Sequence, residues 1–430
     1  MAQQSSEGYF FIPHTRPINL AGLLSGNVTD SPHLPLPQRS NPSEVPGFTD
    51  IQPERTGTDF GSDTAFKYVS NDHEVLKTCV LAVRLGPLAA AGGGLLPRYA
   101  DDVLNQAIEW MEFTVGGTVL QRLWGEQIHC LQLRNLIPED LANAYALQKG
   151  GLTAAARAVY AAAASYPQGF WAYLAIPWWW TETANKHWHQ YACQRTTRIN
   201  IHWRGPEYVL QQDNVNQKPT PVLGGAYIQD MYLRFDVSAL DTQVKEAYIN
   251  TVKGFGSAGI STLMTYQQRQ ENEPIPINST STRIQLTNFN KPSSLIMVMV
   301  RNANNVLPLY TNNRRFEFLP VSSYYSEGSG HRIQQLITDE YAKYRLAAEN
   351  FVGNPNVNLY YVLHSDYAEV VQYPMGNLEY GRLQNPTVTL SWDVAIPAAY
   401  TADIWATCYN YVKLVIAQDG RSGVALEQPI

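Results

Sequence analysis

The aromatic run at residues 170–180, Phe-Trp-Ala-Tyr-Leu-Ala-Ile-Pro-Trp-Trp-Trp, constrains the fold more than any other part of the chain. A strand with one face in water alternates apolar and polar residues, and this run does not. Its six aromatic rings are too many for one wet face, so both sides must be covered, by a second sheet or by another subunit. The run therefore predicts a β-sandwich whose walls are contact surfaces.

Two further segments carry clear strand signals. Residues 198–203 alternate, so that Ile199, Ile201 and Trp203 share one face of a predicted strand. Residues 107–115 and 118–126 form a predicted hairpin around Gly116-Gly117, because glycine adopts the positive φ values of a two-residue turn at low cost. Both signals indicate antiparallel β structure.

Predicted strands recur on both sides of a segment rich in Pro and Gly at residues 205–225, which we interpret as a linker. In the second half these strands are residues 226–235, 281–286, 294–300, 359–364, 387–394 and 411–416. Helical segments are predicted to begin at Pro138 and to cover residues 153–165 and 339–350. The pattern predicts an all-β chain of two sandwiches with short helical insertions, at residues 66–215 and 216–430.

Residues 1–65 are predicted to form an extended N-terminal arm, because prolines recur throughout and prevent a long helix or a central strand. Residues 10–12 and 18–24 are apolar enough to dock on a neighbour. The alternative is a disordered tail.

The composition favours an assembling protein. Only 16% of the residues are charged, against roughly 25% in ordinary soluble domains. Such a shortage indicates a surface that faces other subunits, although a surface of uncharged polar residues would also account for it. The formal charge of −6 argues against a large surface for binding nucleic acid.

The four cysteines, Cys79, Cys130, Cys193 and Cys408, lie far apart and form no Cys-x-x-Cys pair. They are predicted to be free buried thiols rather than a zinc site or a disulfide framework. The first residues have no signal-peptide pattern and no stretch of the chain reaches 18 consecutive apolar residues. We therefore expect the chain to be made and kept in the cytosol or the nucleus.

Taken in order along the chain, six segments resemble motifs of the double jelly-roll major capsid proteins of large icosahedral double-stranded DNA viruses, the family of iridoviruses, phycodnaviruses and giant viruses. These segments are residues 108–126, 176–180, 283–292, 358–364, 372–383 and 406–426. The sequence departs from the family pattern at Ala175-Ile176, where a Pro-Leu pair is usual, and at Met375 and Gly381, where serine is usual. These departures indicate a distant branch.

The resemblance implies two consecutive eight-stranded jelly rolls and a structural rather than an enzymatic role, with no cofactor. It implies homotrimers that form six-sided capsomers, which pack with neighbouring capsomers, minor capsid or penton proteins and an internal membrane. The protein would then reside in the virion and be assembled in the host cytoplasm or nucleus. The arm is expected at the base of the capsomer.

Three groups of residues could suggest other functions. His187 and His189 share one strand face as metal ligands can, but a third ligand is not evident and His202 belongs to another strand, so a structural role is favoured. Two acid pairs, Asp101 with Asp102 and Glu109 with Glu112, could suggest a glycosidase, but solvated or interface carboxylates are favoured. We therefore predict no catalytic, cofactor or metal residues.

The main alternative function is a carbohydrate-binding or carbohydrate-active β-sandwich whose tryptophans stack on sugar rings. That function needs exposed, spaced rings, whereas the contiguous Trp178, Trp179 and Trp180 beside Pro177 favour burial.

Overall fold

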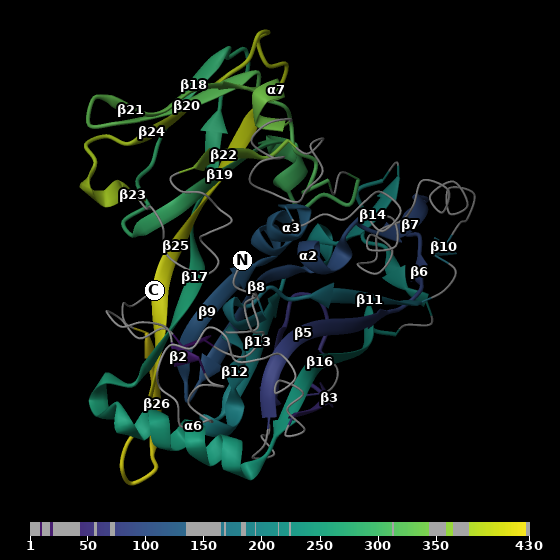
Figure 1. Cartoon of the computed structure of the whole chain (residues 1–430). Coiled ribbons are helices and arrows are strands. Elements are labelled where there is room, and N and C mark those ends of the chain that lie inside the picture. Colours follow the sequence, from purple (N-terminus) through teal and green to yellow (C-terminus); the bar gives the residue numbers. More distant parts are fainter. Residues whose placement is uncertain are drawn as a thin grey trace.

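The computed structural model describes residues 9–10, 18–19, 44–55, 58–68, 74–134, 165–166, 169–181, 186–193, 195–213, 215–222, 225–311, 314–343, 358–363 and 378–426. In this part of the chain, two antiparallel β-sandwiches lie side by side (Figure 1). This arrangement confirms the predicted all-β fold class.

The first sandwich consists of two facing sheets. One has the order β11-β5-β16-β3, with β12 paired to β5; its strands are Phe170–Ala175, Glu74–Leu85, Ile228–Leu240, Glu44–Ile51 and Trp188–His189. The other has the order β4-β13-β8-β9, with strands Asp63–Tyr68, Thr197–Trp203, Ile108–Val115 and Thr118–Trp124. The rings of Tyr68 and Phe235, one from each sheet, meet with centroids 5.4 Å apart, so the core lies between the sheets.

Short elements extend one end of this sandwich. They are the strands β6 (Leu88–Ala89), β7 (Leu95–Tyr99), β10 (Ser165–Tyr166), β14 (Leu210–Asp213) and β15 (Thr220–Pro221), and the helices α2 (Val103–Ala107) and α3 (Gly125–Arg134). Helix α3 follows β9 directly and contacts the second sandwich, where Cys130 packs beside Met299 (Figure 1).

The second sandwich repeats the plan. One sheet has the order β17-β25-β19-β22, with β23 paired to β19 and β26 to β25; its strands are Ile260–Ile275, Tyr400–Ile416, Pro292–Asn302, Tyr360–Leu363, Leu378–Glu379 and Ser422–Leu426. The facing sheet has the order β18-β24-β20-β21, with strands Ser281–Gln285, Thr387–Ser391, Ser323–Gly328 and His331–Thr338. Two further short strands, β1 (Tyr9–Phe10) and β2 (Ile18–Asn19), pair with each other.

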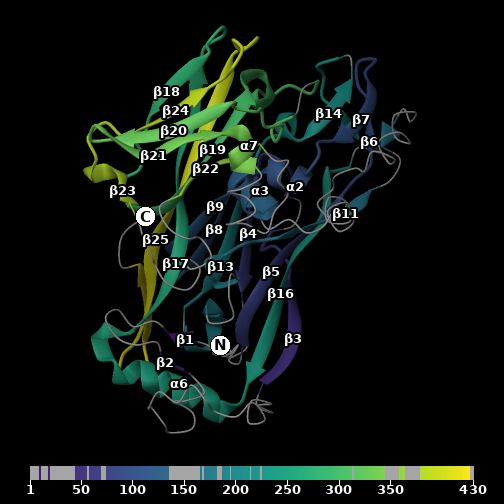
Figure 2. The ribbon, with the colours of Figure 1, turned by 45° about the horizontal axis from the view of Figure 1, so that its top comes forward.

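Helix α6 (Thr242–Gly254) connects the two sandwiches and lies across one end of both, as Figure 2 shows from a second direction. Its first turn is capped by the side chain of Asp241, which accepts a hydrogen bond from the backbone N–H of Gln243. A short helix, α7 (Asp339–Tyr341), begins in the second half at the position where the sequence predicts one. Among the residues that the structure describes, no helix is long and apolar enough to cross a membrane.

The local strand signals are confirmed. In β13 the burial alternates, with Ile199, Ile201 and Trp203 at most 2% exposed. Gly116 and Gly117 form the turn between β8 and β9, with φ values of 59° and 86°. These are left-handed conformations, which explains why the hairpin needs glycine at both positions.

Two boundaries differ from the expected ones. Strand β3 lies within residues 1–65 and β4 begins there, yet both are paired strands of the first sandwich, so the segment from Glu44 onward does not form an arm. Residues 205–225 do not separate the sandwiches, because β16, which follows them, returns to pair with β5 and β3. The chain passes to the second sandwich at α6.

Several expected elements lie outside the described residues: the helix predicted at Pro138, the helix predicted at residues 153–165 except for Ser165, which begins β10, most of the segment 339–350, and most of the arm before Glu44. Conversely, the structure contains β17, β20, β21, α3 and α6, which the sequence did not indicate.

Candidate functional site: the joint between the two sandwiches

The two sandwiches meet through β9 and α3 of the first and the sheet β17-β25-β19 of the second. At the centre, Trp124 at the end of β9 packs on Trp405 of β25, with ring centroids 5.6 Å apart. The Arg269 guanidinium of β17 lies 4.6 Å from the centroid of the Trp124 ring. Apolar side chains of β19 surround the pair, namely Leu295, Met297 and Met299. This contact, together with the ion pairs described next, is called the joint.

A buried carboxylate, Glu126 in the first turn of α3, connects both halves. Its two oxygens accept hydrogen bonds from Nη2 of Arg204, at 2.8 and 2.9 Å, in the first sandwich. Nε of Arg315, from the second sandwich, also donates to Glu126. Arg204 in turn donates to the backbone oxygen of Gln106 at 3.0 Å. One carboxylate is therefore shared by guanidinium groups from the two halves of the chain.

The charge of Glu126 follows from these neighbours. Burial by itself raises the pKa of this carboxyl, but Arg204, Arg315 and Arg301 together hold its pKa well below the ordinary value of 4.5. Glu126 is thus ionised at neutral pH, and the site requires the negative charge because a buried guanidinium needs a partner.

A second ion pair stabilises the other side of the joint. Arg301 of β19 pairs with Asp403 of β25, and each side chain is only 2% exposed. Asp403 also accepts a hydrogen bond from the backbone N–H of Asn272 at 2.8 Å, while Arg301 donates to the backbone oxygen of Arg315 at 3.2 Å. The pair of Arg301 and Asp403 therefore helps to position Arg315, the residue that reaches across to Glu126.

Helix α6 provides an apolar contact at the far end of the two sandwiches. Tyr248 of α6 stacks on His189, with centroids 4.6 Å apart, and meets the ring of Tyr191 edge-on at 5.7 Å. The same cluster includes Leu414 and Ile416 of the second sandwich. The two halves are thus held together at two separate places.

The three consecutive tryptophans are buried, as the sequence predicts. They lie at and beside a short 3₁₀ turn (Trp179–Thr181), and Trp178, Trp179 and Trp180 are at most 1% exposed. All three rings pack around Phe113, with centroids 5.3 to 5.7 Å away. This segment, called the tryptophan turn below, therefore offers no ring face for a sugar.

A single glutamine connects the tryptophan turn to the second sandwich. The backbone N–H of Trp179 donates to Oε1 of Gln121 at 3.0 Å, and Nε2 of Gln121 donates to the backbone oxygen of Thr265 in β17 at 3.0 Å. Gln121 is 2% exposed, so both bonds are shielded from water.

Two histidines that could have indicated a metal site, His189 and His202, contact aromatic or acidic side chains instead. Nδ1 of His189 lies 3.1 Å from the Tyr191 hydroxyl, and its ring is stacked on α6. His202 lies on β13, with Nε2 3.3 Å from a carboxylate oxygen of Glu109. Within the residues that the structure describes, no three His, Cys, Asp or Glu side chains form a group that could hold a metal ion.

The acid pairs are not brought together as catalytic carboxylates. Glu112 accepts a hydrogen bond from Nε of Arg122 at 2.8 Å. Asp102 lies 2.5 Å from Nδ1 of His129 and accepts from Asn105 at 2.8 Å. The carboxylates thus contact basic or amide groups from neighbouring elements.

The cysteines are buried and unpaired, as predicted. Burial raises the pKa of Cys193 to about 11 and that of Cys408 to about 12, and it raises the pKa values of Cys79 and Cys130 further. A thiol that stays protonated is a poor nucleophile, so these side chains act as small core residues.

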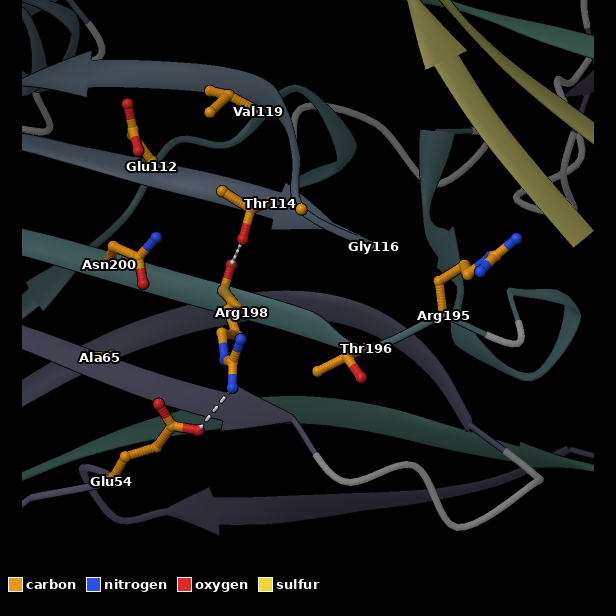
Figure 3. A pocket seen from close by; sticks show the side chains of 11 residues that line it. Glu54, Ala65, Glu112, Thr114, Gly116, Val119, Arg195, Thr196, Arg198 and Asn200 are labelled. Atoms are coloured by element: carbon orange, nitrogen blue, oxygen red, sulfur yellow. Dashed lines mark hydrogen bonds and ion pairs between the residues drawn. The ribbon is translucent and has the colours of Figure 1, made fainter.

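An open hollow lies on the outer face of β4, β13 and β8 (Figure 3). Glu54 pairs with Arg198 across it at 3.2 Å, and the Thr114 hydroxyl donates to the backbone oxygen of Arg198 at 3.3 Å. Arg195 and Gly116 lie at one end. The charged groups of Glu54 and Arg198 satisfy each other, as in an ordinary cross-strand pair.

The sequence did not single out Arg204, Arg315, Arg301 or Asp403. Arg204 and Arg315 lie 78 and 189 residues away from Glu126 along the chain, so no local pattern connects them. The sequence contained one signal, the glycine at position 125. In the structure, a Cβ atom at Gly125 would come within 2.0 Å of the backbone oxygen of Asn105. A glycine required at a strand-to-helix junction marks a close backbone contact.

No known family profile and no curated protein sequence matches this chain. Solved structures do. The chain resembles PBCV-1 VP54, as fitted into a reconstruction of the virophage Sputnik, with a TM-score of 0.67 and 15% identity, covering 89% of this chain and 97% of VP54. The Faustovirus major capsid protein has a TM-score of 0.63 and 9% identity, covering 92% of this chain and 97% of that one. The mavirus major capsid protein has a TM-score of 0.54 and 11% identity, covering 94% and 95%.

The chain has the double jelly-roll fold of major capsid proteins. The likeness extends over nearly the whole length of these neighbours, so both jelly rolls are represented. At these identities few residues are shared, which agrees with the distant branch inferred from the sequence motifs. The joint thus lies between two jelly rolls of one double jelly-roll chain.

Proposed function

We propose that this protein is a major capsid protein that assembles into pseudo-hexameric homotrimeric capsomers and, through them, into the icosahedral shell of a double-stranded DNA virus. The observation that carries the proposal is the pair of jelly rolls connected side by side through the buried ion pairs of Glu126. The same double fold is found in the major capsid proteins of Faustovirus and mavirus.

The geometry supports a function that depends on shape. Each jelly roll is one of two similar blocks, so three chains around a three-fold axis supply six blocks and a tile with six sides. Such a tile packs on a hexagonal lattice without any chemical reaction. For a fixed shape, the angle between the two blocks must be the same in every copy, and the joint and the contact of α6 are the two structures that hold this angle.

The electrostatics support a role in assembly rather than in catalysis or nucleic-acid binding. The net charge of −6 and the low charged fraction of 16% fit large uncharged contacts between copies. Three acidic side chains that could act as catalytic groups, Glu109, Glu112 and Asp102, lie beside basic groups. They are not arranged as a pair around a substrate.

Neighbouring capsomers are the first partners that the proposal implies. Minor capsid or penton proteins and an internal membrane are further candidates, for which the arm before Glu44 would supply the contact at the base of the capsomer. In this proposal the mature protein resides in the virion and is assembled in the host cytoplasm or nucleus.

The oligomeric state of the purified full chain tests the proposal. Light scattering or mass photometry at micromolar concentration should give three times the mass of the chain, and electron microscopy should show six-sided particles. A monomer that persists at micromolar concentration would contradict the proposal, as would a dimer with no trimer.

A further inference from the structure

The outer face of the sheet β11-β5-β16-β3 carries a group of partly exposed aromatic side chains. We call these side chains, Trp171, Tyr173, Tyr232 and Phe48, together with Arg234 beside them, the aromatic strip. Phe48 is 68% exposed and Tyr173 is 37% exposed, which is unusual for large apolar side chains on a flat sheet. Figures 1 and 2 place β3 and β16 on the side of the first sandwich that faces away from the second. The joint therefore does not explain this surface.

The strand register brings the aromatic strip together. Tyr173 of β11 and Tyr232 of β16 are both register partners of Ala82 in β5, and that alanine is fully buried. A small residue between two tyrosines leaves room for their rings to come together over the middle strand. Trp171 adjoins both tyrosines, with centroids 6.3 Å from Tyr173 and 5.5 Å from Tyr232. The rings thus form one continuous surface across three strands.

An ion pair between Arg234 and Asp50 lies at the other edge of the aromatic strip. The Arg234 guanidinium lies 5.0 Å from the centroid of Phe48 and 5.4 Å from that of Tyr232. Arg234 also donates two hydrogen bonds to the carboxylate of Asp50, at 2.7 and 2.6 Å. Its charge is therefore neutralised within the face, which argues against a phosphate-rich partner such as nucleic acid or an anionic membrane.

The composition and size of this face fit a protein partner. Trp, Tyr, Phe and Arg are the residue types enriched in the cores of protein interfaces. The strands β11, β5, β16 and β3 together offer about 600 Å² of flat face, at about 3.3 Å per residue and about 4.8 Å between strands. A stable interface buries about 800 Å² per partner, so this sheet supplies most of the area that such an interface needs.

We propose that the aromatic strip is a contact through which one copy of this chain packs on a second copy. The inference rests on the proposed function, and it specifies the surface that the assembly uses. In a closed ring of three chains the contact is heterologous, so the strip of each copy meets a different surface of the next. Two strips facing each other would instead give a closed dimer.

The test replaces two exposed rings by carboxylates, in the double variant Phe48→Glu and Tyr173→Glu. Both positions are partly exposed in the single chain, so the folded monomer tolerates the charges, whereas a packed interface does not. The association constant, measured by mass photometry from nanomolar to micromolar concentration, should fall at least about 30-fold. The matched control is Val394→Glu, at a side chain that is 77% exposed on the second sandwich, and it should assemble as the wild type does.

Each outcome has a distinct meaning. If the wild type forms trimers and the double variant forms them equally well, the aromatic strip is not the contact, but the proposed function stands. If the wild type remains monomeric, both are contradicted. If the double variant does not fold, it shows no cooperative thermal transition. In that case the wild type is tested instead, by hydroxyl-radical footprinting. Phe48 and Tyr173 should be protected in the oligomer relative to the dilute monomer, and Val394 should not.

A carbohydrate ligand is the competing occupant of an exposed aromatic surface. Footprinting of the dilute monomer with neutral oligosaccharides distinguishes it. Protection of Tyr173 by an oligosaccharide, without protection on oligomerisation, would assign the strip to sugar binding and overturn the inference.

Discussion

The tryptophan turn and the joint are both buried, yet opposite kinds of side chain stabilise them. The tryptophan turn packs three indole rings around Phe113 inside the first sandwich. The joint instead surrounds the Glu126 carboxylate with guanidinium groups, one of which comes from the second sandwich. Apolar contacts depend little on the relative orientation of the side chains, whereas a shared carboxylate accepts hydrogen bonds from its donors in only a few orientations. The turn therefore contributes mainly stability, and the joint contributes to the relative orientation of the two halves.

The largest expected effect is in the tryptophan turn. Trp179→Ala should lower the free energy of unfolding by about 3–5 kcal/mol, because the lost ring leaves a cavity in a close-packed core. Urea denaturation followed by circular dichroism measures the loss. Trp392→Ala, at a partly exposed ring of the second sandwich, is the control and should cost less. Wild-type stability in alanine variants of Trp178, Trp179 and Trp180 would show that the turn is not part of the core.

The second effect concerns the charge in the joint. Glu126→Gln keeps the shape of the side chain but leaves Arg204 and Arg315 in a buried site without their counter-charge. We expect a loss of about 3 kcal/mol in the free energy of unfolding, measured by the same urea titration.

A triple variant sharpens this result. Glu126→Leu combined with Arg204→Met and Arg315→Met removes every charge of this group and should cost less than Glu126→Gln alone. If the triple variant is stable but its particles are irregular in electron micrographs, the ion pairs determine orientation. Regular particles from the triple variant would show that apolar packing suffices for that purpose.

The stabilisation by Glu126 depends on pH in a defined direction. Its pKa is lowered in the folded chain, so its contribution is fully present above the ordinary value of 4.5 and is lost progressively as the pH falls below it. The difference in unfolding free energy between wild type and Glu126→Gln should therefore shrink between neutral pH and pH values below 4.5. A difference that stays constant over that range would mean that the carboxylate charge is not the stabilising feature.

The smallest effect is expected at Glu271, a second acid near the joint. Burial raises the pKa of Glu271 even though Arg269 donates to it at 2.7 Å. A raised pKa means that the folded chain favours the neutral form, so stability from this group is greatest below the ordinary value of 4.5 and declines as the pH rises. Glu271→Gln should therefore change the free energy of unfolding at pH 7 by less than about 1 kcal/mol, or raise it slightly.

Glu271→Gln is thus a matched control for Glu126→Gln, since both remove one carboxylate charge near the same place. Equal losses in the two variants would contradict the assignment of a special role to Glu126. Thermal unfolding of the two proteins side by side measures the difference.

Much of the first sandwich was predictable because its signals are local. The alternation of Ile199, Ile201 and Trp203 follows from the two-residue period of a strand, and all three are buried as expected. The turn at Gly116-Gly117 follows from the φ values that only glycine adopts easily. These features depend on residues that are neighbours in the sequence.

Strand β17 was not predicted because the C-terminal half of its sequence is polar. Gln267 and Gln270 are both 4% exposed in the structure, where their side chains bond to Thr407 and to the backbone oxygen of Gln285. A buried glutamine looks like a surface residue in the sequence, since its burial depends on partners that are distant along the chain. Helix α6 was missed for a related reason, because only Lys245, Tyr248 and Val252 of its residues are buried.

The sequence by itself determined that the chain is a β protein with a densely aromatic first core and two sets of strands. Those properties follow from side-chain periodicity and from the need to keep clustered rings away from water. Only the tertiary structure decided that β16 belongs to the first sandwich, that α6 connects the two, and that Glu126 meets Arg204 and Arg315. The physical reason is that a buried charge is stable only beside its partners, and nothing in the local sequence indicates which distant residues will come close.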